Sequence, residues 1–322
     1  MPGSTDSPGG PGAVGMADGP ATPTAILFPG QGAQAVGMAG DWVAAEPAAR
    51  QLFTRAADVL GYDLLAVCRE GPSGRLNTTA VSQPAILVTS LAALEILRRR
   101  EGHPLAAASV TAGLSLGEYT ALVFAGAIEF ESAVRLVDVR GRAMQDCAER
   151  RPGAMLAVLG VDRERLAALC DECRAGDVLE VANVLCPGNI VVSGSAEACG
   201  RVAAAAPAAG AIKCVPLEVA GAFHTVLMQP AVERLAAALA ETRIQPPRIP
   251  VVSNVDALPH ADPDEIRGLL ARQVVGVVEW QASMAYLLSA GVRSFWEVGP
   301  GRVLRGLLKR IDRAVPCHGV FD

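Results

Sequence analysis

The chain has 322 residues, of which 51% are hydrophobic, so it can bury a sizeable core as one large domain or as one domain with an insertion. Its net charge of −5 gives no overall basic field that would hold nucleic acid or an anionic membrane surface. We therefore expect no nucleic acid and no membrane among its partners, and we find no apolar run of the ~18 residues that would span a bilayer.

Residues 1–24 consist largely of Gly, Pro, Ala and Ser, so we expect a disordered extension outside the fold. The extension has no arginine and no basic region, which argues against a signal or transit peptide. The eight cysteines are scattered, which indicates reduced thiols and a cytoplasmic protein. No second CxxC pair accompanies Cys170 and Cys173, so we expect no metal site.

A short buried strand is predicted over residues 25–28, and the glycine-containing loop 29–34 follows it. This loop lacks the GK[ST] ending of a phosphate-binding loop and the spacing of a dinucleotide site, so nucleotide binding is disfavoured. Composition alone leaves two interpretations open, an anion-facing loop around Gln31 or an ordinary turn. From residue 42 to residue 100 the pattern is helical.

Residues 109–126 contain the most informative motif of the chain. A strand-like run over residues 109–112 leads into Gly113-Leu114-Ser115-Leu116-Gly117, and an apolar helix is predicted over residues 118–125. This is the G-x-S-x-G pattern of a nucleophile elbow in a strand-turn-helix context, which exposes the Ser115 hydroxyl. The alternative is an ordinary Gly-Ser turn between a strand and a helix.

A helix predicted over residues 131–149 places one arginine on the wrong face. Its polar residues form one continuous stripe, and Arg140 lies on the opposite, apolar face. A buried guanidinium needs an anion, which is either an internal carboxylate or the carboxylate of a substrate. Residues 153–219 then follow the order β-α-β-β-α-β, which predicts a ferredoxin-like module.

Two polar residues follow that module. His224 lies at a loop-to-helix junction, where it is either a general base for the serine or a surface or capping residue. A helix over residues 262–274 begins with Asp262 as its N-cap and carries Gln273 on its apolar face. Gln273 is either a buried amide with internal partners or part of the site.

Three stretches carry a family resemblance: FPGQGAQ at residues 28–34, GLSLGEYTAL at residues 113–122 and GAFH at residues 221–224. Together they resemble the malonyl-CoA:acyl carrier protein transacylases and the related acyltransferase domains of polyketide synthases, from about residue 25 to near the C-terminus. The family usually has His directly before the serine, where this chain has Leu114.

The resemblance implies an α/β fold, a hydrolase-like core with a parallel sheet (residues 25–150 and 220–322) and an inserted ferredoxin-like subdomain (residues 151–219). It implies a monomer that moves malonyl from malonyl-CoA to the phosphopantetheine thiol of an acyl carrier protein, for fatty acid or polyketide synthesis. No cofactor is expected beyond malonyl-CoA as the substrate.

The resemblance also implies a role for each site residue. Ser115 is the nucleophile, His224 is its base, and the amides of Gln31 and Leu116 form the oxyanion hole. Arg140 binds the malonyl carboxylate, and the backbone carbonyl of Gln273 orients the histidine. In polyketide acyltransferases a Phe at the position of Phe223 accompanies malonyl specificity.

Two other functions use the same residues differently. A thioesterase of this fold would use Ser115 and His224 with water as the acceptor, whereas Arg140 favours transfer because it holds the acyl group. A non-catalytic docking domain would need neither Ser115 nor His224.

Overall fold

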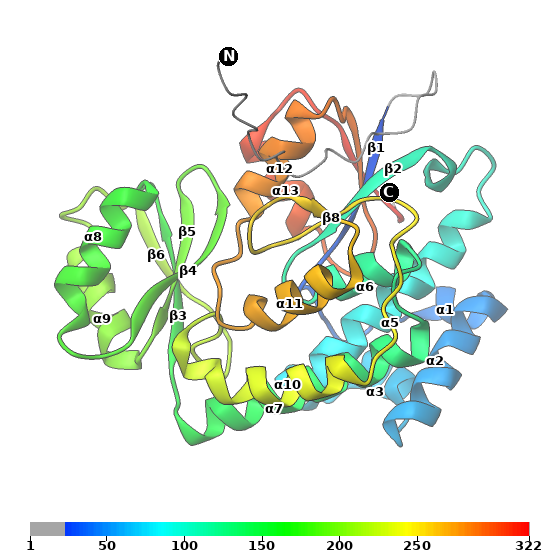
Figure 1. Ribbon diagram of the computed structural model, residues 1–322, viewed down its shortest axis with the longest axis horizontal. Helices are drawn as coiled ribbons and strands as arrows, with labels where there is room; N and C mark the ends of the chain where they lie inside the picture. The colour runs from blue at the N-terminus through cyan, green and yellow to red at the C-terminus, as the bar shows by residue number, and fades with distance from the viewer. Residues whose placement is uncertain (1–22, 322) are drawn as a thin grey trace, which may run out of the picture.

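The computed structural model describes residues 23–321, so the predicted extension lies outside the described residues except for residues 23 and 24. The larger of two sheets has the strand order β10-β9-β1-β2-β7-β8 (Figure 1). Its neighbouring strands are parallel, except that β8 runs antiparallel to β7. The strands are β1 Thr24–Phe28, β2 Ala108–Gly113, β7 Val251–Val252, β8 Pro259–His260, β9 Ser294–Glu297 and β10 Cys317–Gly319.

Helices cover both faces of this sheet, as a parallel sheet requires. Successive side chains of β1 show it: Ile26 and Phe28 pack into one apolar cluster, Ala25 and Leu27 into another, and all four are fully buried. The helices outside the small sheet are α1 Asp41–Ala45, α2 Pro47–Leu60, α3 Leu64–Glu70, α4 Ser73–Leu76, α5 Thr79–Arg98, η1 Pro104–Ala107, α6 Gly117–Phe124, α7 Phe130–Arg150, η2 Val226–Met228, α10 Gln229–Ala240, α11 Pro263–Gln273, α12 Trp280–Ser289 and α13 Val303–Ile311.

Helix α5 corrects one expectation. It is long and apolar enough to cross a membrane by length and composition, contrary to the sequence analysis, which found no such run. However, 78% of its apolar window is buried inside the protein, since α5 packs between α2, α6 and α7. Its hydrophobicity is that of a core helix.

The second sheet is antiparallel with the order β4-β5-β3-β6, and α8 and α9 pack on it to one side of the rest of the chain (Figure 1). Its elements are β3 Ala154–Leu159, α8 Arg163–Arg174, β4 Leu179–Cys186, β5 Asn189–Gly194, α9 Ala196–Ala205 and β6 Lys213–Pro216. This β-α-β-β-α-β order confirms the ferredoxin-like module and the α/β fold class, while the boundaries 151–219 stay a prediction.

One short bridge ties the small sheet to the segment after α11. Val184 N donates to Val278 O at 3.0 Å, and Val278 N donates to Ala182 O at 2.9 Å. Strand β4 is therefore fastened directly to the chain that leaves Gln273.

Candidate active site

Ser115 lies at the carboxyl end of β2, in a turn that two glycines make possible. A Cβ on Gly117 would lie 2.2 Å from Phe28 O, and a Cβ on Gly30 would lie 2.3 Å from Leu114 O. The turn is thus pressed against the loop that follows β1, with no room for a side chain at either position. Ser115 itself has φ of 49°, a strained value for a residue other than glycine.

The structure brings Ser115 and His224 together, as the family resemblance implied. Ser115 Oγ lies 2.9 Å from His224 Nε2, and His224 Nδ1 lies 2.8 Å from the backbone oxygen of Gln273. A carbonyl can only accept, so Nδ1 carries the proton and Nε2 presents its lone pair to the hydroxyl. The imidazole is therefore oriented to accept the Ser115 proton.

Arg140 joins the same hydroxyl from α7. Its Nη2 donates to Ser115 Oγ at 3.1 Å and to Gln273 Oε1 at 3.0 Å, and its Nη1 donates to Gln83 Oε1 at 2.8 Å. Only 2% of the residue is exposed, and its Nε has no hydrogen-bond partner in the described part of the chain. The internal carboxylate considered for Arg140 is not among these direct partners.

The two predicted oxyanion donors lie on adjacent loops. Gln31 follows β1, Leu116 follows Ser115, and β1 and β2 are parallel neighbours, so both backbones lie at the same edge of the sheet. The Gln31 side chain points to Thr79, 3.5 Å from Nε2 to Oγ1. The roles of both amides stay a prediction.

Sequence reasoning missed three polar residues that hold this site, Gln83, Glu118 and Asn254. Asn254 Oδ1 accepts from Ser115 N at 2.5 Å, and its Nδ2 donates to Gly113 O at 2.7 Å, so one amide fixes both sides of the turn. Each of the three is a buried polar residue beside apolar neighbours, the same signal that singled out Gln273.

Burial sets the charge of the titratable groups. Burial, together with the positive charge of Arg140, lowers the pKa of His224 to about 4, so the imidazole is neutral at pH 7. Burial raises the pKa of Glu118 to about 7, against the lowering effect of hydrogen bonds from Asn254 and Gln273. The site thus holds a neutral base beside a buried cation.

A cleft of about 340 Å³ leads to His224 between the small subdomain and the segment after α11. Its walls include Arg163, Arg174 and Glu180 on one side and Val275 and Val277 on the other. Among residues 23–321, no three His, Cys, Asp or Glu side chains are grouped so as to hold a metal ion.

The comparison with known proteins decides the family. Residues 26–310 match the family model described as the acyl transferase domain. The chain is 43% identical over 290 residues to the malonyl CoA-acyl carrier protein transacylase of Escherichia coli (strain K12), which covers 90% of this chain and 93% of that protein. The chain belongs to the malonyl CoA-acyl carrier protein transacylase family.

Solved structures of malonyl transacylases are similar to this chain over about nine tenths of its length. An acyl carrier protein S-malonyltransferase from Vibrio cholerae is 39% identical with a TM-score of 0.85, covering 92% of this chain and 96% of that one. A malonyl-transacylase in complex with its type II PKS acyl-carrier protein is also 39% identical, with a TM-score of 0.85 and coverage of 92% and 94%.

Leu114 and Phe223 directly precede the two predicted catalytic residues, Ser115 and His224. Leu114, which departs from the His that the resemblance implies before the serine, packs against the apolar cluster that contains Val278 and Trp280, so an apolar side chain suits its surroundings. Phe223 is buried in the larger apolar cluster, and its effect on acyl choice stays a prediction.

Proposed function

We propose that this chain transfers a malonyl group from malonyl-CoA to the phosphopantetheine thiol of an acyl carrier protein through an acyl-serine intermediate. The observation that carries the proposal is the convergence on Ser115 Oγ of His224 Nε2 at 2.9 Å and Arg140 Nη2 at 3.1 Å. One group accepts the proton of the nucleophile, and the other offers a cation to the far end of the acyl group. The relatives named for malonyl transfer support the same reaction.

In the first half-reaction His224 Nε2 accepts the Ser115 proton as Oγ attacks the thioester carbon of malonyl-CoA. The oxygen that becomes negative is bound by the N–H groups of Gln31 and Leu116, each contributing roughly 2.7–4 kcal/mol to lowering the barrier. The carbon–sulfur bond breaks, and the CoA sulfur leaves with the proton from Nε2. Malonyl-Ser115 remains.

The second half-reaction repeats these steps in reverse with a different thiol. The carrier thiol gives its proton to Nε2 and attacks the ester carbon, and Ser115 Oγ leaves and recovers that proton. One thioester replaces another, so the atoms and charges balance without a resident cofactor. Because Gln273 O accepts from Nδ1–H, the histidine keeps the tautomer that both halves need.

Arg140 gives this transfer its acyl preference. A malonyl ester on Ser115 places its free carboxylate within a few bonds of Oγ, where Nη2 already points. Acylation releases that N–H from the hydroxyl, and the unpartnered Nε is a further donor in the same buried site. An acetyl group offers no carboxylate to these donors.

Incubation with malonyl-CoA and a holo carrier protein tests the proposal. We expect malonyl-carrier rather than free malonate as the product, and a malonyl adduct on the peptide that contains Ser115. The Ser115→Ala variant should show neither product nor adduct while remaining folded. Release of free malonate with the carrier present would instead indicate a thioesterase, and an unlabelled native chain would indicate a docking domain.

We also propose that the protein works as a monomer in the cytoplasm, for fatty acid or polyketide synthesis. Six cysteines are buried as free thiols, which supports a reducing compartment: Cys68, Cys147, Cys170, Cys173, Cys186 and Cys199. Light scattering on the purified chain tests the oligomeric state, since a monomer of this length has a mass of 33.2 kDa.

A further inference from the structure

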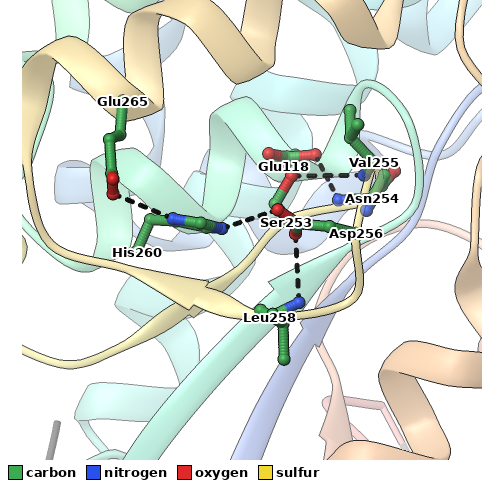
Figure 2. Close-up of polar contacts among 8 residues, drawn as sticks. All are labelled: Glu118, Ser253, Asn254, Val255, Asp256, Leu258, His260 and Glu265. Atoms are coloured by element: carbon green, nitrogen blue, oxygen red, sulfur yellow. Dashed lines mark hydrogen bonds and ion pairs between the residues drawn. The ribbon is translucent and has the colours of Figure 1, made fainter. Parts of the chain in front are cut away.

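Glu118 is a buried carboxylate that the mechanism above does not use. It lies in the first turn of α6, three residues after the nucleophile, and is 3% exposed. Its Oε2 accepts from Asn254 N at 3.0 Å and from Gln273 Nε2 at 2.6 Å. Figure 2 shows Glu118 beside Asn254, whereas the carboxylates of Asp256 and Glu265 bind His260 instead.

Arg140 is a buried cation whose direct hydrogen-bond partners are all neutral. Its three hydrogen bonds within the described residues go to the amides of Gln83 and Gln273 and to the hydroxyl of Ser115. The neutral Tyr119 side chain also lies beside the guanidinium, with its ring 5.5 Å from the guanidinium carbon, and it attracts the cation without supplying a counter-charge. A buried charge with no anion near it is costly, so a counter-charge is expected close by.

The amide of Gln273 connects the two charges. Its Nε2 donates to Glu118, and its Oε1 accepts from Arg140 Nη2, so the amide dipole runs from the anion to the cation. One side-chain amide thus separates the Glu118 carboxylate from the Arg140 guanidinium, and no Arg140 N–H donates directly to the carboxylate. A direct ion pair would occupy the donors that a substrate carboxylate needs.

We propose that Glu118 is the counter-anion of Arg140, held one amide away so that the guanidinium is balanced in the empty enzyme while none of its N–H groups is paired with a carboxylate before malonyl binds. The inference rests on the proposed function, because it assumes that Arg140 binds the acyl carboxylate. Glu118 touches no reacting atom and is therefore a positioning residue. Its negative charge weakens the hold on malonyl, which lets the group leave on the carrier.

The charges around Glu118 support this role. The titratable groups that reach it electrostatically are Arg140 and Asp256, and Tyr119 and His224 lie beside Arg140. Burial raises the pKa of Tyr119 far above neutrality and lowers that of His224 to about 4, so both are uncharged near pH 7. Burial raises the pKa of Glu118 to about 7, so its charge changes with pH around neutrality.

The Glu118→Gln variant isolates the charge, because a glutamine oxygen can still accept from Asn254 N and from Gln273 Nε2. Calorimetry in a Ser115→Ala background gives the Kd of malonyl-CoA and of acetyl-CoA without acylation. We expect Glu118→Gln to tighten malonyl-CoA binding about tenfold and to leave acetyl-CoA within about twofold. Asp256→Asn is the matched control, a neighbouring carboxylate that acts on Glu118 only at a distance and has no bond to Gln273, and it should change either Kd by less than about twofold.

Weaker malonyl-CoA binding, or an equal change for both ligands, would overturn the proposal. If Glu118→Gln does not fold, the Ser115→Ala protein with native Glu118 gives the same test at about pH 6 and about pH 8.5. Protonation of Glu118 at the lower pH should favour malonyl-CoA over acetyl-CoA, and a constant ratio overturns the proposal.

The Arg140→Met variant in the same background separates this inference from the proposed function. If Arg140→Met keeps the malonyl preference, the carboxylate-binding role of Arg140 fails and takes the inference with it. If the preference is lost but Glu118→Gln binds like its parent, only the counter-anion role of Glu118 fails.

Discussion

Replacing Arg140 with Met tests the acyl preference most directly. Methionine fills nearly the same volume, so the loss is that of the charged donors rather than of packing. A malonyl carboxylate would lose two charge-assisted hydrogen bonds, each worth about 1.5–3 kcal/mol. The sum of about 3–6 kcal/mol corresponds to a fall of roughly 10²–10⁴ in kcat/KM for malonyl-CoA.

The assay is transfer from malonyl-CoA and from acetyl-CoA to a holo carrier protein, followed by mass spectrometry of the carrier. Acetyl transfer should fall little or rise, because acetyl never used the guanidinium. Arg142→Met is the matched control, since Arg142 lies one half-turn away on α7, exposed and paired with Asp138. A malonyl-to-acetyl ratio in Arg140→Met that stays within about threefold of the parent would refute the carboxylate-binding role.

Three further predictions concern the base, its support and the elbow. In initial rates measured against pH, kcat/KM should fall only as the pH drops through about 4, because the pKa of folded His224 lies below its ordinary value of 6.5 and the imidazole stays neutral between these two values. In Arg140→Met this fall in kcat/KM should occur at a higher pH. A fall near pH 6.5 in the native protein would contradict the role of His224 as the base. Gln273→Met keeps the backbone carbonyl that accepts from His224 but loses the side-chain hydrogen bond to Arg140. The rate of acetyl transfer should therefore stay within about threefold of the parent, while the ratio of malonyl to acetyl transfer falls about tenfold. An equal loss for both acyl groups would argue against separate roles for the carbonyl and the side chain of Gln273. Gly117→Ala should lower both the midpoint of thermal unfolding and the activity, because the new Cβ would lie 2.2 Å from Phe28 O. Gly200→Ala in α9 is the control: its Cβ would meet nothing within 4 Å, so the substitution should be neutral or stabilising. Equal midpoints for the two variants would contradict the close packing inferred at Gly117.

Local sequence was sufficient for the parts of the site that local geometry builds. Ser115 follows from its G-x-S-x-G turn, and the burial of Arg140 follows from its place on the apolar face of a helix, whereas the role of Arg140 came from the family resemblance. His224 needed the family resemblance, because a histidine at a junction has several ordinary uses and nothing nearby indicates a partner 109 residues away. The membrane-length apolar helix α5 was missed although its length and composition are properties of the sequence, whereas its place in the core depends on its packing.

The supporting network was beyond reach for a physical reason. Asn254 meets Ser115 across 139 residues, and Gln273 meets Glu118 across 155. Such contacts depend on which strands become neighbours, and periodicity within one segment carries no information about that order. Buried polar residues in apolar stretches were the available signal, and it indicates that a partner exists without identifying the partner.

The bridge between β4 and Val278 has a mechanical consequence for the cleft. His224 is joined to the small subdomain through β6, and the chain carrying its acceptor, Gln273, is fastened to the same subdomain through Val278. A hinge motion that widened the entrance for a carrier-borne thiol would therefore displace imidazole and carbonyl in the same direction. The hydrogen bond between His224 Nδ1 and Gln273 O would be kept during such a motion, and the distance that changes would be the one between His224 Nε2 and Ser115 Oγ.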